Sequence, residues 1–263
     1  MDLRNRILYR DPLMLVLDKP AGIPVHAGPG GARSLEDDFA SLRFGQARDP
    51  ALAHRLDRDT SGFLVLGRHR KALRKLGRLF AAGRIEKIYW AVTRGRPERD
   101  QGRIEAPLRK RTERGKGWRM EIDPEGASAA ASESSRRVIN KGGEGWLAAV
   151  TDWRVLGFKD GLAWLELRPL TGRTHQIRVH CAALGCPVLG DPVYGPVYGR
   201  ETVIVPPLHL HARAVVVPLY ANREPIAVVA PPPDYMIATM RALGWNPGDG
   251  VKSKSESANV NDA

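Results

Sequence analysis

The stretch from His54 to Gly62 holds the residues of this chain best suited to chemistry. It reads His-Arg-Leu-Asp-Arg-Asp-Thr-Ser-Gly, so two carboxylates stand between arginines and the segment ends in small residues that suit a tight turn. On extended chain Asp57 and Asp59 share a face, and Arg55 lies where it can screen the charge of Asp57. The apolar run Phe63–Leu66 follows and is typical of a buried strand. A charged loop fixed to a core strand can hold a reactive carboxylate rigidly.

The alternative is a solvated turn in which arginine and aspartate simply pair, a contact that contributes little to stability. A second dense segment far downstream argues for a site. Residues 168–180 read Arg-Pro-Leu-Thr-Gly-Arg-Thr-His-Gln-Ile-Arg-Val-His, and residues 185–195 read Gly-Cys-Pro-Val-Leu-Gly-Asp-Pro-Val-Tyr-Gly. Together with the segment around Asp57, they resemble the RluA-like family of RNA pseudouridine synthases.

Other segments fit the same family in the same order. They are Val16–His26, which contains Asp-Lys-Pro-Ala-Gly, then Glu86–Val92, which reads Glu-Lys-Ile-Tyr-Trp-Ala-Val, and Leu208–Ala212, which reads Leu-His-Leu-His-Ala. The resemblance runs from about Leu13 to about Leu243. The motifs around Asp57 and Arg178 are specific as a pair, whereas the shorter pieces are weak alone.

The resemblance implies an α+β fold with a large mixed, mostly antiparallel sheet, packed helices and a central cleft. Strand patterns outnumber helix patterns, which agrees. No linker divides the chain, so we expect one catalytic domain at 1–244, with no N-terminal RNA-binding module before it. Residues 245–263 are polar and aperiodic and are predicted to be a disordered tail.

The resemblance also assigns roles. Asp57 matches the catalytic aspartate of the family, Arg178 the arginine that pairs with it, and Tyr89 the tyrosine that lies against the target base. Without the resemblance, Tyr89 would be interpreted as a half-buried sheet residue, facing away from Ile88 and Trp90.

Seven further residues are predicted to contact RNA. Arg55 and Arg58 are candidates to hold the displaced backbone or fill the gap left by a flipped base, and pairing with Asp59 is their alternative. The remaining five are Arg109, Lys110, Arg111, Arg173 and His175. For the cluster at 109–111 a solvated loop is the alternative.

Conversion of uridine to pseudouridine breaks the N1–C1′ bond, joins C5 to C1′ and releases the C5 proton. Because nothing is oxidised or hydrolysed, we expect no organic cofactor and no metal. A carboxylate suits the work, since it can attack a sugar or base carbon or move a proton. His175, His180, Cys181 and Cys186 match no zinc spacing.

Composition agrees with an RNA partner. The formal net charge is +12, and 31 arginines stand against 10 lysines. Arginine suits phosphates and base edges better than a point charge does, although a basic surface also suits acidic lipid. The two cysteines suggest reduced structural thiols, and no run of about 18 apolar residues predicts a membrane span. We therefore expect a cytoplasmic protein, with a monomer as the default.

Periodicity predicts the elements that carry these residues. A helix is expected from Ala72 to Phe80, ended by Gly83, and another from Thr174 to about Gly185. Residues 109–145 are predicted to form a basic hairpin with a lengthened tip, and 150–156 with 162–167 a strand pair.

Two other functions remain open at this point. A magnesium-dependent phosphoryl-transfer enzyme could use Asp57, Asp59 and Asp191 as metal ligands. A non-catalytic RNA-binding protein would also explain the charge. Which RNA and which uridine are modified, and which atom Asp57 attacks, do not follow from the sequence.

Overall fold

The structure, a computed structural model, describes residues 1–28, 31–113, 117–123, 145–196 and 205–248. The strands are β1 (Ile7–Arg10), β2 (Met14–Lys19), β3 (Ala51–Leu52), β4 (Ser61–Gly67), β5 (Glu86–Arg94), β6 (Gln101–Glu105), β7 (Leu108–Glu113), β8 (Gly117–Ile122), β9 (Val150–Lys159), β10 (Leu162–Pro169), β11 (Leu210–Val217) and β12 (Ile226–Val229). The helices are α1 (Arg70–Ala81), α3 (Gln176–Ala183) and α4 (Asp234–Ala242), with 3₁₀ turns η1 (Leu3–Arg6) and η2 (Leu35–Leu42).

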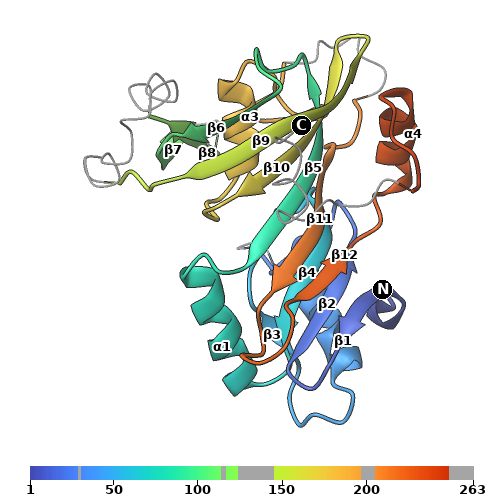
Figure 1. The fold of residues 1–263 in the computed structure, drawn as a ribbon. Coiled ribbons are helices and arrows are strands. Elements are labelled where there is room, and N and C mark those ends of the chain that lie inside the picture. The colour runs from blue at the N-terminus through green and yellow to red at the C-terminus, as the bar shows by residue number, and fades with distance from the viewer. Residues whose placement is uncertain (29–30, 114–116, 124–144, 197–204, 249–263) are drawn as a thin grey trace.

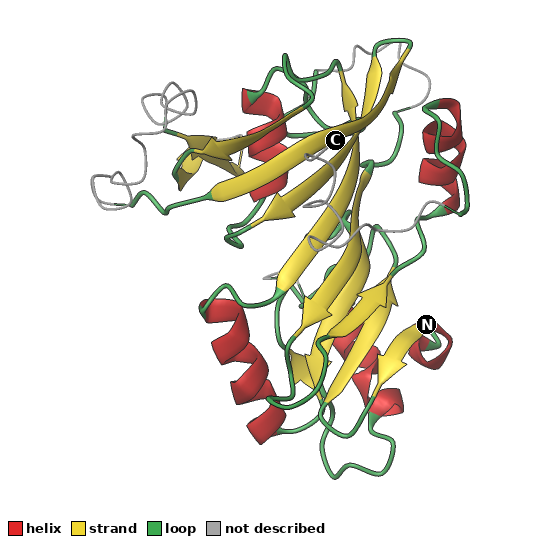
Figure 2. Ribbon diagram, viewed as in Figure 1, coloured by secondary structure: helices red, strands yellow, loops and turns green. Residues whose placement is uncertain are grey.

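Ten of the strands form one sheet (Figures 1 and 2). Its order is β1-β2-β4-β11-β5-β10-β9-β6, with β12 beside β11 and β3 beside β4. The β4–β11 pair is parallel and the other pairs of named strands in the sheet are antiparallel. The hairpin β7–β8 forms a second, two-stranded sheet beside α3. This architecture confirms the predicted α+β fold with a mixed, mostly antiparallel sheet.

The two faces of the central strand β5 enter different cores, as its alternating sequence predicts. Tyr89 belongs to the main core, whereas Trp90 packs with Trp164 and α4 in a second cluster. Trp245 also lies in this second cluster and is 7% exposed. The prediction that the tail begins at 245 is therefore wrong, because the Trp245 ring packs in one cluster with the buried side chains of α4. Residues 249–263 lie outside the described ranges.

The predicted helices form, with one change. For α1, His69 accepts a hydrogen bond from the Ala72 N–H at 3.2 Å, and Gly83 follows at φ +64°. The second helix, α3, begins at Gln176 rather than Thr174, because His175 has a left-handed φ of +54°. None of the helices in the described ranges has the length and apolar character needed to cross a bilayer.

The predicted strand pair is also present, and the hairpin is shorter than predicted. Strand β9 continues to Lys159, past the expected end at 156, and pairs with β10. The basic cluster at 109–111 lies on β7, which pairs with β8. The prediction of one hairpin over 109–145 with a lengthened tip is wrong, because β7 pairs with β8, which already ends at Ile122. Residues 124–144 follow β8 and lie outside the described residues.

Sheet register brings the Asp57 loop to Tyr89. Gly62 pairs with Ala212 of β11, and Ala212 pairs on its other side with Tyr89 of β5. Gly62 has φ +107°, and a Cβ there would lie 2.1 Å from the Ala212 carbonyl oxygen. Only glycine allows this approach, and the loop that carries Asp57 ends at it.

A buried lysine secures the other side of the same loop. The Lys19 ammonium, fully buried, donates to the carbonyl oxygens of Pro20, Ile23 and Arg58 at 2.8, 2.8 and 2.9 Å. The Gly22 N–H also donates to the Arg58 oxygen. Burial lowers the pKa of Lys19 to about 8, against the opposing pull of Asp59 and Asp57. Lys19 thus ties the loop after β2 to the Asp57 loop.

Substitution Lys19→Met is expected to lower the free energy of unfolding by about 2–3 kcal/mol, because three carbonyls lose a buried donor. Urea titration at neutral pH measures this. Since folding lowers the pKa of Lys19, the unfolded chain binds more protons between pH 8 and 10.5, and this side chain makes stability rise with pH across that window. The variant should lose that rise; an unchanged pH slope would contradict the assignment.

Candidate active site

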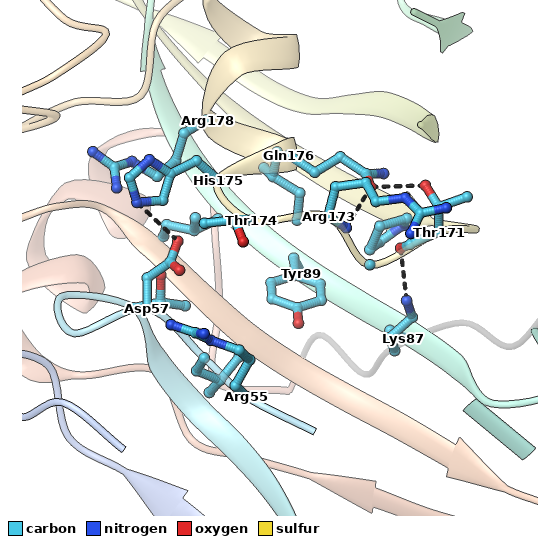
Figure 3. Close-up of a pocket in the computed structure, with 16 residues that line it drawn as sticks. Arg55, Asp57, Lys87, Tyr89, Thr171, Arg173, Thr174, His175, Gln176 and Arg178 are labelled. Carbon is cyan, nitrogen blue, oxygen red and sulfur yellow. Dashed lines mark hydrogen bonds and ion pairs between the residues drawn. The ribbon is translucent and has the colours of Figure 1, made fainter. Parts of the chain in front are cut away.

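A pocket opens where the Asp57 loop, strand β5 and the segment leading into α3 meet (Figure 3). Its lining includes Asp57, Tyr89, Arg178 and His175, so the structure brings the three predicted catalytic residues to one cavity. In the close-up the Tyr89 ring lies between Asp57 and His175 on one side and Lys87 on the other.

Asp57 lies in the loop before β4, with 22% of its side chain exposed. Its Oδ2 lies 3.9 Å from the Nε2 of His175. The carboxylate is therefore open to a substrate in the pocket, and one side of it faces an imidazole instead of water.

His175 is held by a hydrogen-bonded relay. The Met120 N–H donates to the Tyr194 hydroxyl at 2.9 Å, and this hydroxyl lies 2.9 Å from Nδ1 of His175. With Met120 as its donor, Tyr194 can give its own proton to Nδ1, which leaves the imidazole proton on Nε2, facing Asp57. Burial lowers the pKa of His175, more than the nearby charge of Asp57 raises it. A neutral His175 thus has its N–H directed toward Asp57, at 3.9 Å between the heavy atoms and so beyond hydrogen-bond distance.

The β7–β8 hairpin completes this arrangement. The Trp118 ring of β8 stacks on His175 with centroids 5.0 Å apart and planes 23° apart. Below it, Leu108 and Met120 pack against Val179 of α3. The hairpin that carries the basic cluster is therefore in direct contact with the residue beside Asp57.

The predicted pairing of Arg178 with Asp57 is wrong in this structure. The Arg178 guanidinium instead donates twice to the Asp191 carboxylate, at 2.7 and 2.7 Å, and lies 5.1 Å from the Tyr194 ring centre. Burial alone would raise the pKa of Asp191, but Arg178 and the N–H groups of Val193 and Tyr194 outweigh it and lower that pKa. Since Asp191 supplies two oxygens in the plane of the guanidinium, it is the stronger partner. Arg178 acts on Asp57 through space, as a charge in the pocket wall.

Tyr89 presents its ring to the pocket and is 8% exposed. The Phe63 ring meets it edge-on at 5.8 Å. Burial and then the charge of Asp57 raise the pKa of Tyr89 far above its ordinary value. The hydroxyl therefore keeps its proton at neutral pH, and the residue is suited to stacking rather than to proton abstraction.

Lys87 is a site residue that the sequence prediction missed. It shares a strand face with Tyr89, lines the pocket, and donates to the Thr171 carbonyl at 2.9 Å. Burial lowers its pKa to about 8. The strand alternation places Lys87 on the same face as Tyr89, which the resemblance assigned to the site, and could have identified it. Tyr194, Trp118 and Asp191 were missed as parts of the site because their contacts cross long stretches of sequence.

The predicted RNA-contact residues near the pocket differ in their surroundings. Arg55 is exposed at the pocket rim. Arg58 is exposed and pairs with Asp59 at 3.1 Å, the alternative considered for it. Arg173 is exposed and donates to the Ala148 carbonyl at 3.0 Å.

The basic cluster on the hairpin is partly neutralised. Arg109 and Arg111 both pair with Glu121 on the neighbouring strand β8. Lys110 lies 5.0 Å from the Trp118 ring centre. The three side chains are exposed and keep a net positive charge next to the pocket.

In the part of the chain that the structure describes, no three His, Cys, Asp or Glu side chains gather as a metal site would require. The three acids of the magnesium hypothesis have other partners: Asp57 faces His175, Asp59 pairs with Arg58, and Asp191 holds Arg178. Cys181 and Cys186 are buried free thiols, and burial raises the pKa of both.

The mixed sheet, with an aspartate and a buried tyrosine in one pocket, agrees with the class of pseudouridine synthases, and comparison with known proteins shows that class. The RNA pseudouridylate synthase family model matches residues 13–183. An uncharacterized RNA pseudouridine synthase of Zymomonas mobilis is 39% identical over 88% of this chain and 95% of its own length. A mitochondrial pseudouridylate synthase of Xenopus tropicalis is 32% identical over 94% of this chain and 83% of its own.

Solved structures show the same likeness. Human RNA pseudouridylate synthase domain containing 4 superposes with a TM-score of 0.70 at 27% identity, over 92% of this chain and 94% of that one. Human RNA pseudouridylate synthase domain containing 1 gives 0.69 at 29% identity, over 96% and 92%. This chain belongs to the RNA pseudouridylate synthase family. It is an RNA-modifying isomerase, and of the three functions considered for it, the catalytic one is correct.

Substitution Tyr194→Phe is expected to lower kcat about tenfold with little change in KM, because His175 loses the donor that fixes its tautomer. Long-range ¹⁵N–¹H spectra of the imidazole should show the proton on Nε2 in the wild type. In the variant they should show a mixture of the two neutral tautomers, with the proton on either nitrogen. Tyr220→Phe removes a hydroxyl bonded to the distant Asp11 and serves as the control. A wild-type imidazole protonated on Nδ1 alone would refute the relay.

Substitution Arg178→Met is expected to destabilise the fold by about 3–5 kcal/mol, because it leaves Asp191 charged and buried without its partner. The double variant Arg178→Met/Asp191→Leu should recover most of the free energy of unfolding but not the activity, since the charge near Asp57 is still missing. Denaturant titration and turnover measure the two effects. Full activity in the double variant would show that Arg178 serves stability alone.

Proposed function

We propose that Asp57 is the catalytic carboxylate of the uridine isomerisation. The observation that carries this is the shared pocket: Asp57 is half-buried but open to the cavity, which the ring of Tyr89 also lines. A flat pyrimidine held against that ring would place its glycosidic bond within reach of the carboxylate.

Three side chains of the pocket share the tasks of the reaction. The N1–C1′ bond breaks, the uracil turns, C5 bonds to C1′, the C5 proton leaves to solvent, and N1 takes up a proton, so the product is an isomer of the substrate. An ionised Asp57 serves each route considered for this chemistry: attack at C1′, attack at C6, or removal of a ribose proton. Tyr89, kept protonated by its burial, stacks on the base while it turns. His175 aims the carboxylate through its Nε2–H.

The target uridine must leave its stack to reach this pocket. Arg55 is exposed at the rim and is suited to fill the gap or to hold the displaced backbone. Arg173 lines the same opening and would contact a flanking phosphate. Lys110 of the β7–β8 hairpin lies against Trp118, which stacks on His175 of the pocket, and would contact RNA farther from the target base.

Ribosomal or transfer RNA is the proposed substrate, because both present structured loops from which a uridine can be splayed. The buried, unpaired thiols are compatible with action in the cytoplasm, and a monomer is the expected state. Mapping of pseudouridines in total RNA from cells with and without the gene identifies the RNA and the position. Fractionation and sedimentation address the compartment and the oligomeric state.

Substitution Asp57→Asn is expected to lower tritium release by at least about 10⁴-fold, because the amide cannot act as a nucleophile or base. The substrate is bulk RNA labelled at uridine C5, from cells that lack the gene. Asp59→Asn is the matched control, since Asp59 pairs with Arg58 in the same loop, and it should keep most activity. Wild-type release by the Asp57 variant would refute the proposed role.

A further inference from the structure

Helix α1 carries an unusual concentration of positive charge that the pocket does not explain. Its sequence, Arg-Lys-Ala-Leu-Arg-Lys-Leu-Gly-Arg-Leu-Phe-Ala, contains five cations and no acidic residue, and Arg84 follows just beyond its end. Within the described ranges, none of these six side chains has an ion-pair partner within 4.0 Å. Lys75 makes a cation–π contact, with its ammonium 5.7 Å from the Tyr220 ring centre. The other five are exposed.

This charge does not stabilise the helix. Arg70, Arg74 and Arg78 stand four residues apart, so they form one row of like charges, a spacing that costs a few tenths of a kcal/mol per pair. Arg70 and Lys71 occupy the first turn, where the helix dipole disfavours cations. The helix is held by its buried face, with Leu76 in the main core. The exposed row is therefore arranged for something other than the fold.

Several exposed arginines elsewhere on the surface have carboxylate partners. Arg33 binds Asp38, Arg103 binds Asp152 and Arg109 binds Glu121. On α1 the unneutralised charges gather along a helix of about 18 Å. A row of unpaired guanidinium and ammonium groups of this length matches a phosphate backbone and no small anion.

The row also leads to the active site. The C-terminal end of α1, Phe80–Gly83, lines a groove together with Lys87, Tyr89 and Arg173. The same three residues line the catalytic pocket, so groove and pocket are continuous. In Figure 1, α1 and the β7–β8 hairpin lie on one side of the long sheet, and α4 lies on the other. RNA that leaves the pocket through the groove meets the end of α1 first.

We propose that the exposed face of α1 binds the backbone of the RNA strand that flanks the target uridine. Arg70, Arg74 and Arg78 contact successive phosphates, with Lys71 and Arg84 at the two ends of the row. The inference rests on the RNA modification activity of the family, and it assigns to α1 a binding role separate from the chemistry at Asp57.

The test compares two triple variants that remove the same charge. Arg70→Gln/Arg74→Gln/Arg78→Gln changes α1, and Gln preserves helix propensity. Arg99→Gln/Lys159→Gln/Arg241→Gln changes three exposed cations on the β5–β6 connection, β9 and α4, which have no recorded ion pair among the described residues. Binding to an oligouridylate of about 30 nucleotides is measured against salt, and circular dichroism verifies that both variants fold.

The α1 variant should lose about two units of the log–log salt slope, about 0.7 for each single-strand phosphate contact, which is about 40-fold weaker binding near 0.15 M salt. The control variant should lose less than about half a unit of the salt slope, which is less than one phosphate contact contributes. An oligouridylate of about six nucleotides, too short to extend from the pocket along α1, should bind all three proteins alike. On labelled bulk RNA the α1 variant should show raised KM and unchanged kcat.

Equal losses of slope in the two variants would overturn the proposal, because net charge alone would then explain binding. An unchanged slope in the α1 variant would overturn it as well. Failure of the proposed chemistry would be seen in a different measurement. If the wild-type protein binds the oligouridylate but releases no tritium from any RNA, the catalytic role of Asp57 is refuted, and the salt slopes still test the binding role of α1.

Discussion

The close approach of Gly62 to Ala212 is the constraint on which the site depends. Only two residues of β4 pair with β11, and there a side chain on Gly62 would collide with the Ala212 carbonyl. Because Ala212 also pairs with Tyr89, this one contact fixes how far the Asp57 loop lies from the aromatic ring. The Ser61 hydroxyl, 2.9 Å from Nδ1 of the buried His211, holds the same junction from the next position. The spacing of carboxylate and ring is thus set by backbone, not by flexible side chains.

The net charge that faces the pocket depends on which ionisable side chains are paired with each other or kept neutral by burial. Arg178 and Asp191 neutralise each other in the wall, and burial keeps His175 neutral and Tyr89 protonated. Asp57 is therefore the principal uncompensated anion facing the cavity among the described lining residues. A carboxylate so placed need not be released from a tight ion pair before it reacts, and the neutral imidazole N–H orients it without quenching its charge.

Local patterns in the sequence predicted α1, α3 and the β9–β10 pair, because alternation and helical spacing depend on neighbours along the chain, whereas the residues of the pocket came from the family resemblance. The local patterns failed where the partner is distant or the backbone departs from a regular state. The resemblance implied Asp57 as the partner of Arg178, and no local pattern pointed to Asp191, which follows Arg178 after the end of α3 and a turn. The left-handed conformation of His175 delayed the start of α3 by two residues. Trp245 follows the last helix in a polar context, and only the tertiary fold shows that it covers α4.

The distribution of paired and unpaired charges bears on which part of this basic protein attracts RNA. Pairing with acidic neighbours removes much of the field around the hairpin and the β6–β9 edge, where Arg109 and Arg103 have carboxylate partners. A paired arginine attracts a phosphate weakly, because the phosphate must compete with the carboxylate. The unpaired row on α1 keeps its full charge and lies at the end of the groove that leads from Tyr89. If α1 binds RNA as proposed, its unpaired charges attract the strand along a line that passes the pocket, and acidic residues elsewhere weaken competing sites.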